Sequence, residues 1–168
     1  DKDVSSSIDH MFNTERILKN NNINIEFVNI LDLMNTKYGR WILKQSNTPI
    51  LYSGIFRGKY ISGITHIDIS KTYNFYYMRK GIKEVLIIPL EFEKYVNMSY
   101  GIHNVYVRDE TSNSHNISTL KWLDNIPYYY RFYLKEGEIL IFNNSGCLHK
   151  FVNKTPNNIA LTSRVLNF

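Results

Sequence analysis

A histidine and an aspartate stand two residues apart in the stretch Ile61 to Ile69, whose alternating side chains are typical of a β-strand. Because side chains in a strand repeat every two residues, His66 and Asp68 point to the same face, about 6 to 7 Å apart along the chain. With a second imidazole, for which His149 is the candidate, they complete a 2-His-1-carboxylate facial triad, which holds Fe(II) and leaves coordination positions open. The spacing alone is not specific, and a half-buried strand with an ordinary polar pair is the alternative.

The overall composition indicates a packed globular chain. Its 168 residues suffice for one domain. A single cysteine, Cys147, excludes an internal disulfide framework, and no Cys/His cluster has the spacing of structural zinc. This cysteine usage favours a reducing, intracellular setting, cytoplasmic or nuclear. No apolar run approaches the roughly 20 residues that a membrane span requires, so we expect no membrane association.

The charge balance leaves two interpretations open. A formal net charge of +5 could favour an acidic or nucleic-acid partner. No dense block of Lys and Arg is present, however, so a solvated, lysine-rich surface is the simpler interpretation.

Strand patterns dominate the chain after residue 40. Runs rich in β-branched and aromatic residues, separated by Gly, Asn or Ser turns, predict strands at 23–29, 41–44, 49–56, 59–69, 73–79, 82–90, 128–134, 139–142, 148–153 and 159–166. Helical turns are expected at 30–35 and 91–98 and a loop at 36–39, while 117–123 could be a short helix or a strand. So many short strands predict a mainly β fold, a sandwich or barrel with a few short helices.

Two segments stand outside this pattern. Residues 1–22 predict a polar, serine-rich N-terminal arm with a short helical candidate at Ile8 to Leu18, which leaves 23–168 as a single domain. Residues 99–116, with the polar run Asp109 to Ser114, predict a long loop. Long loops in compact domains are commonly functional or mobile, so this one could act as a lid.

Two sets of motifs lie within about residues 40–166. Thr65-His66-Ile67-Asp68 is followed from Asn74 by Asn-Phe-Tyr-Tyr-Met-Arg-Lys-Gly-Ile-Lys-Glu-Val-Leu-Ile-Ile-Pro. From Lys135 the chain reads Lys-Glu-Gly-Glu-Ile-Leu-Ile-Phe-Asn-Asn-Ser-Gly-Cys-Leu-His-Lys-Phe-Val-Asn, and from Ile159 Ile-Ala-Leu-Thr-Ser-Arg-Val. In order and spacing these motifs resemble the cupin-like Jumonji-C oxygenases. The resemblance implies a double-stranded β-helix, that is, a jelly-roll or cupin-like barrel.

The resemblance also implies a set of ligands. It implies that His66, Asp68 and His149 bind Fe(II), that Lys83 holds the distal carboxylate of 2-oxoglutarate, and that Asn74 touches this cosubstrate. The alternation of the strand supports Lys83 independently, because it places the lysine on one defined face, where a diacid inside a barrel needs a cation. A solvated lysine beside a glycine turn is the alternative.

The sequence departs from the family pattern around the cosubstrate. Where the family often has a Thr or Ser three residues before the first metal histidine, this chain has Gly63, and Thr65 would face the opposite side of the strand. Tyr52 or Tyr60 could replace the missing contact. Arg164 could be a second carboxylate anchor or an exposed strand residue. The candidate cofactor-binding residues are thus Lys83, Asn74, Thr65, Tyr52 and Arg164.

The activity that the resemblance implies is that of a 2-oxoglutarate-dependent dioxygenase that hydroxylates a protein side chain. N-methyl-lysine demethylation and RNA-base hydroxylation are further options, so the expected partner is a protein or peptide, with RNA as the alternative. Two other classes stay open. One is a non-oxygenase cupin metal protein, such as an isomerase or a small-molecule binding module, which has no use for Lys83. The other is a degenerate barrel with a structural or interaction role.

The remaining candidate residues have simpler interpretations. His10, His103 and His115 have no partner at ligand spacing and are expected at the surface. Cys147 would share the strand face of His149 and either line the site or be a small buried thiol. The aromatic run Tyr128 to Tyr133 could bind peptide or bases, or form the barrel wall.

Overall fold

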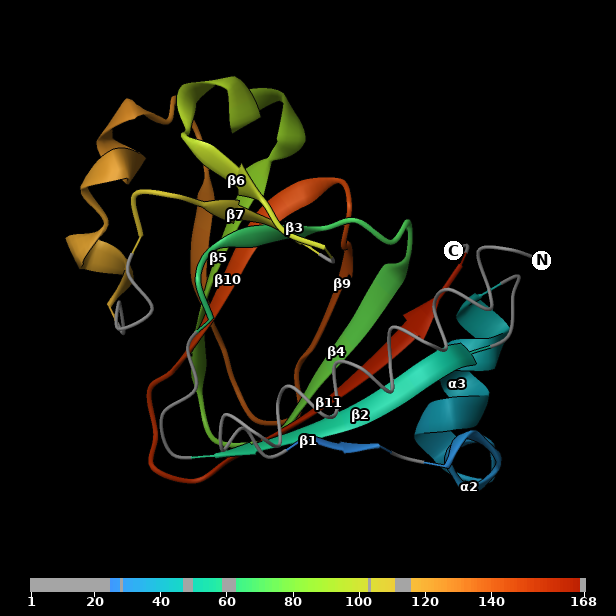
Figure 1. Cartoon of the computed structure of the whole chain (residues 1–168). Helices are drawn as coiled ribbons and strands as arrows, with labels where there is room; N and C mark the ends of the chain where they lie inside the picture. Colours follow the sequence, from blue (N-terminus) through green and yellow to red (C-terminus); the bar gives the residue numbers. More distant parts are fainter. Residues whose placement is uncertain are drawn as a thin grey trace.

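Two antiparallel β-sheets face each other in a computed structural model of the chain, with short helices on their outer sides (Figure 1). The structure describes residues 25–27, 29–46, 50–58, 63–102, 104–110 and 116–166. The five-stranded sheet has the order β1 (Ile25–Phe27), β2 (Ile50–Gly58), β11 (Asn158–Val165), β4 (Tyr73–Lys80), β9 (Ile139–Asn143). The six-stranded sheet has the order β6 (Met98–Tyr100), β7 (Asn104–Val107), β3 (His66–Asp68), β10 (Cys147–Asn153), β5 (Lys83–Pro89), β8 (Tyr130–Leu134).

The path of the chain between the sheets is that of a jelly roll. Strands β2 to β5 alternate between the two sheets, and β8 to β11 return in the same way, so that late strands insert between early ones. β6 and β7 extend the six-stranded sheet beside β3, and β1 extends the other sheet beside β2. Eight strands in two such sheets are the architecture of cupins. The predicted mainly β, double-stranded β-helix with a few short helices is therefore confirmed.

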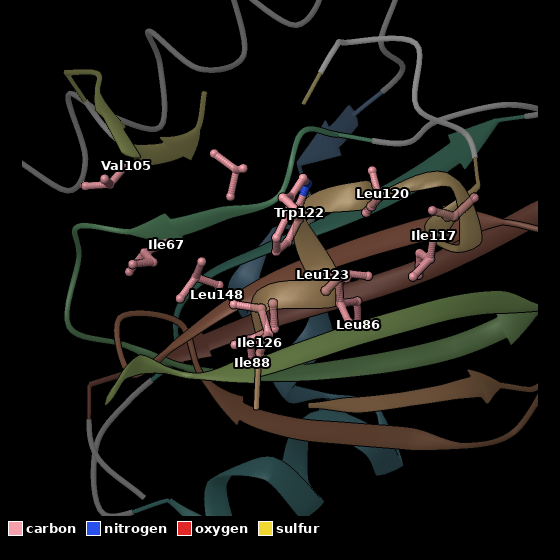
Figure 2. Packing of buried hydrophobic residues seen from close by; sticks show 12 residues of the cluster. Ile67, Leu86, Ile88, Val105, Ile117, Leu120, Trp122, Leu123, Ile126 and Leu148 are labelled. Atoms are coloured by element: carbon pink, nitrogen blue, oxygen red, sulfur yellow. The ribbon is translucent and has the colours of Figure 1, made fainter. Parts of the chain in front are cut away.

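Apolar side chains form three layers around the sheets. The interior layer, between the sheets, contains Tyr76, Met78, Val85, Leu134, Phe142, Cys147 and Ala160. On the outer side of the six-stranded sheet, Leu86, Ile88 and Leu148 pack under Trp122, Leu123 and Ile126 (Figure 2). Because β5 is covered on both sides, its sequence from Val85 to Pro89 is continuously apolar, as is typical of strands buried on two faces.

The third layer corrects the secondary structure expected at 36–44. Residues Lys37–Gln45 form helix α3, which follows α2 (Ile30–Met34), so the loop expected at 36–39 and the strand expected at 41–44 are wrong. Thr36 is the N-cap, since its side chain accepts a hydrogen bond from the Gly39 N–H at 3.0 Å. Ile42, with no exposed surface, packs with Leu33 and Phe75 on the five-stranded sheet. Packing of the helix on the sheet has overridden the local preference of branched and aromatic residues for strands.

The prediction of a loop at 99–116 is also wrong for the residues up to Val107. β6 and β7 pair there as a hairpin, with Ser99 opposite Tyr106, while 111–115 lie outside the described residues. In the strand expected at 59–69, only His66–Asp68 is a strand among the residues described. Three short 3-10 helices cover Leu90–Tyr95, Ile117–Thr119 and Lys121–Asn125. The arm predicted at 1–22 lies outside the described residues.

One glycine is required where the chain crosses from β4 to β5. Gly81 has φ +86°, and a Cβ there would lie 2.5 Å from side-chain oxygens of both Asn158 and Thr155. Only glycine adopts this backbone conformation without strain and leaves room for these oxygens. The corner sets the start of β5, and therefore the position of Lys83. Among the helices that the structure describes, none is long and apolar enough to cross a membrane.

Candidate metal centre

The three predicted ligands lie on two neighbouring strands of the six-stranded sheet. β3 carries His66 and Asp68, and β10 carries His149, which pairs directly with His66. Directly opposite residues of an antiparallel pair turn their side chains to the same face. That face is the interior, because Cys147 and Phe151, which alternate with His149, pack in the interior layer.

The ligand atoms of these residues converge. One atom from each of the three lies within 4.8 Å of the other two. His66 Nε2 is 3.6 Å from Asp68 Oδ1, and His149 Nε2 is 3.9 Å from Asp68 Oδ2. Three atoms no more than 4.8 Å apart share a point within 4.8/√3, or about 2.8 Å, of each. Nitrogen and oxygen ligands of zinc lie about 2.0 to 2.2 Å from the metal, so side-chain shifts of roughly 0.7 Å would close this site on an ion.

Hydrogen bonds determine which imidazole nitrogen faces the carboxylate. Nδ1 of His66 lies 2.7 Å from the carbonyl oxygen of Ile64, and Nδ1 of His149 lies 3.3 Å from that of Cys147. When Nδ1–H donates to a carbonyl, Nε2 holds the lone pair, which is the usual arrangement of a metal-binding histidine. Burial and, to a lesser extent, the neighbouring His66 together lower the pKa of His149 to about 3, so this imidazole is neutral at physiological pH.

The donor set fits a divalent first-row metal. Both nitrogen-to-oxygen separations exceed a hydrogen-bond length, so neither imidazole is engaged by Asp68 through its Nε2. Two imidazole lone pairs and a carboxylate around one point are the donors of the 2-His-1-carboxylate site, which suits Fe(II). Other divalent ions of the first row bind the same set, with affinities that follow the general order for such metals.

Arg164 reaches the site from the opposite sheet. It lies on β11, and its Nη2 donates to Asp68 Oδ2 at 3.0 Å. The guanidinium therefore orients the carboxylate while the other oxygen, Oδ1, faces His66. Of the two roles expected for Arg164, an exposed strand residue is wrong, and a contact to a cosubstrate stays a prediction.

Aromatic rings enclose the two histidines. The ring of Phe142 lies 5.0 Å from that of His149, and the ring of Tyr106 lies 5.9 Å from that of His66. Tyr106 and Asn104 pair with His66 and Asp68 and therefore share their face, and Asn104 Nδ2 donates to Tyr106 Oη at 3.1 Å. The sequence interpretation missed Asn104 and Tyr106, although their alternation with two valines was a strand signal within the expected loop.

Cys147 is a buried thiol beside the site. Its Sγ lies 3.9 Å from His149 Nδ1, on the side of the ring away from Asp68. Burial raises the pKa of Cys147 to about 12, with the charge of Asp68 adding to the shift, so the thiol stays protonated. A protonated thiol is a poor metal ligand, and the interpretation as a small buried thiol is confirmed.

Lys83 lies on the interior face of the same sheet, at the start of β5, whereas His149 pairs with Ile87 near the end of that strand. It is 4% exposed, and its Nζ donates to Asn153 Oδ1 at 2.5 Å and lies 6.0 Å from the centre of the Tyr76 ring. Burial lowers its pKa from 10.5 to about 8. The alternative of a solvated lysine beside a turn is therefore wrong.

The other predicted cofactor residues divide between the two sides of the sheets. Asn74 is buried on the interior side, where it pairs with Arg164 and accepts a hydrogen bond from Thr162 Oγ1 at 2.5 Å. Thr65 is fully buried, and alternation with His66 turns it to the outer side, away from the site. The backbone of Tyr52 pairs with Arg164, but its side chain, like Tyr60 and the histidines at 10, 103 and 115, lies outside the described residues.

Comparison with known proteins does not identify a family for this chain. No protein-family model matches the chain, and no curated protein matches it. Among the solved structures with a detectable likeness is hydroquinone 1,2-dioxygenase from Sphingomonas sp. TTNP3 with 4-hydroxybenzoate bound, at 14% sequence identity and a TM-score of 0.42. The likeness covers 68% of this chain and 59% of that chain. Membership of the Jumonji-C family stays a prediction from the sequence motifs.

Proposed function

We propose that this protein is an Fe(II)- and 2-oxoglutarate-dependent oxygenase that hydroxylates a protein side chain. One observation carries the proposal: a 2-His-1-carboxylate cluster and a buried lysine lie on the same interior face of one sheet. The cluster alone would support any cupin metal site. The lysine adds a specific requirement, because a buried cation indicates an anionic group at that end of the interior.

Lys83 and the ligand cluster lie on the same interior face, at different positions along one strand pair. His149 pairs with Ile87, and Lys83 lies four residues from Ile87 on β5, which is roughly 13 Å along the strand. A diacid bound between these two positions would direct one carboxylate to the ligand cluster and the other to the ammonium group of Lys83.

Each residue would then have a defined task. His66, Asp68 and His149 would hold the metal on one side and leave the opposite side open, and Arg164 would keep the Asp68 carboxylate in its ligating orientation. Lys83 would bind the distal carboxylate. When bound, the metal and cosubstrate supply the oxidation, in which 2-oxoglutarate, O2 and a substrate C–H bond yield succinate, CO2 and a C–OH bond. The rings of Phe142 and Phe151 would exclude water from this space.

A titration under argon tests the cosubstrate. Adding 2-oxoglutarate to the Fe(II)-loaded protein should produce a weak visible charge-transfer band that is absent from His149→Ala. Lys83→Met should weaken 2-oxoglutarate binding by at least tenfold, because it removes the cation, whereas the exposed Lys80→Met is the matched control and should behave as wild type. A band that appears with equal affinity in Lys83→Met would refute the proposed anchor.

The substrate is tested separately. Succinate release measured over pools of peptides and of RNA should rise with peptides, as a protein hydroxylase requires. Release that rises only with RNA would replace the protein substrate by a nucleic acid.

A second function is favoured by the packing between the two ends of the interior. The rings of Tyr76 and Phe151 stack there with centres 4.4 Å apart, and Asn153 already accepts a hydrogen bond from Lys83. If these rings fill the space of a cosubstrate, the protein is a cupin metal protein that acts on a small molecule without 2-oxoglutarate. It would then retain metal through His66, Asp68 and His149 and show no band in the titration above.

A further inference from the structure

A buried ion pair lies directly behind the metal ligands. Lys150 follows His149 on β10 and pairs with Leu86, which places its side chain in the outer apolar layer. There its ammonium group forms an ion pair with Glu110, and the two side chains are 1% and 0% exposed. The same ammonium donates to the carbonyl oxygen of Gly63 at 2.7 Å.

This second bond connects the two ligand strands. The described ladder between β3 and β10 consists of one pair, His149 opposite His66. On its other side the strand with two of the three ligands forms a ladder with β7, and further backbone hydrogen bonds hold its ends. Asp68 N–H donates to the Asn144 carbonyl at 3.1 Å, and Val107 N–H donates to the Thr65 carbonyl at 2.9 Å. The bond from Lys150 to Gly63 ties the segment before His66 to the residue next to His149.

We propose that Lys150, held by Glu110, is a positioning residue that sets the separation of His66 from His149 and thereby the affinity of the site for metal. The inference depends on the proposed metal centre. A lateral movement of β3 relative to β10 changes the distance between the two Nε2 atoms, and the ammonium group opposes this movement because it connects β10 both to the segment of β3 and to the strand on the far side of β3. Gly63 leads into β3, and Glu110 follows β7, the other neighbour of β3.

Stability alone gives little reason for an ion pair at this place. Replacing a buried pair by apolar side chains of similar size is often neutral or stabilising, because burial removes both charges from water. The surroundings here are apolar, with Leu86, Leu148 and Ile117 in the same layer (Figure 2). Glu110 Oε2 has no hydrogen-bond partner among the described residues. A directed contact between segments, which apolar residues cannot provide, accounts for the pair better.

The test replaces the pair without changing net charge. In K150M/E110L apolar side chains replace both charges of this pair, so urea unfolding of the metal-free protein should show a stability near that of wild type. Binding of Co(II) should weaken by about 10- to 100-fold, the usual effect of removing a group that orients a metal ligand. The visible bands of bound Co(II) should also shift, because the positions of the two imidazoles change. The matched control is E84L/R131M, which removes the ion pair between β5 and β8 in the same sheet. Lys154, the second partner of Glu84, is partly exposed and stays solvated, so Co(II) affinity and spectrum should be unchanged.

The results of these experiments distinguish an error about the positioning role of Lys150 from an error about the metal centre. If wild type does not bind Co(II), or if His149→Ala binds it equally well, the metal centre is wrong and the inference fails with it. If wild type binds through His149 and K150M/E110L has the same affinity and spectrum, the positioning role alone is refuted. Should K150M/E110L not fold, Glu110→Gln keeps the shape of the side chain and removes only its charge. Its Co(II) affinity should fall several-fold, and an unchanged affinity would overturn the role.

Discussion

Lys83 provides a prediction whose size follows from the structure. Its pKa falls from 10.5 to about 8 because burial disfavours the charged form. A difference of one pKa unit corresponds to about 1.4 kcal/mol, so the fold disfavours protonated Lys83 by about 3 kcal/mol. We expect this penalty to be visible in the stability of the metal-free protein and to disappear in Lys83→Met, which retains the apolar stem without the charge.

The direction of the pH dependence follows from proton linkage. Below about pH 8 Lys83 is protonated in both the folded and unfolded chains, so the full penalty is present. Between about 8 and 10.5 the unfolded chain binds more protons than the folded one, and the free energy of unfolding therefore rises with pH. Above 10.5 both forms are neutral and the penalty is gone.

Urea unfolding from pH 7 to pH 11 measures this effect as a difference between proteins. The free energy of unfolding of wild type should rise by up to about 3 kcal/mol relative to Lys83→Met over that range, since other titrating groups are common to both. The exposed Lys80→Met should show no such difference from wild type. A flat difference between wild type and Lys83→Met would refute the reasoning, because Lys83 would then titrate alike in the folded and unfolded chains.

Three further predictions address the cosubstrate, the metal and the fold. If protonated Lys83 binds 2-oxoglutarate, affinity measured by anaerobic calorimetry should fall by about tenfold per pH unit above pH 8, and the same slope in Lys83→Met would contradict this role. Arg164→Met should weaken Co(II) binding by about tenfold in equilibrium dialysis, because Asp68 loses the guanidinium that orients it, and wild-type affinity would argue against that orientation. Gly81→Ala should lower the free energy of unfolding by more than about 1 kcal/mol in urea, since φ is +86° and a Cβ meets two oxygens at 2.5 Å; an unchanged midpoint would be inconsistent with the corner described.

The candidate metal ligands could be predicted from the sequence because strand alternation is a local property. His66 and Asp68 share a face whatever the rest of the chain does, and His149 completes a familiar set of donors. The other contacts of the site depend on which strands become neighbours. Arg164 reaches Asp68 from the opposite sheet, and Tyr106 lies beside His66 only because β7 pairs with β3. Neither contact has a signal in the spacing of the sequence.

The secondary structure predicted from the sequence was wrong where tertiary packing determined the conformation. Residues 41–43 are branched or aromatic and favour a strand locally, yet they lie in a helix because Ile42 and Leu33 pack on the five-stranded sheet. In the segment 99–116 the polar residues around it outweighed the one strand signal, the alternation in Asn104–Val107, because strands of three and four residues give only a short periodic pattern.

The register of β10 links the fold to the chemistry. Cys147, His149 and Phe151 face the interior, while Leu148, Lys150 and Val152 face the outer layer. A slip of one residue would exchange the two sets and place Lys150 at the ligand position. This exchange would remove native contacts from both layers. Phe151 would lose its ring stacking with Tyr76, and Lys150 would lose its ion pair with Glu110 and its hydrogen bond to Gly63. The same residues that hold the strand in register therefore decide that an imidazole, and not an ammonium group, meets Asp68.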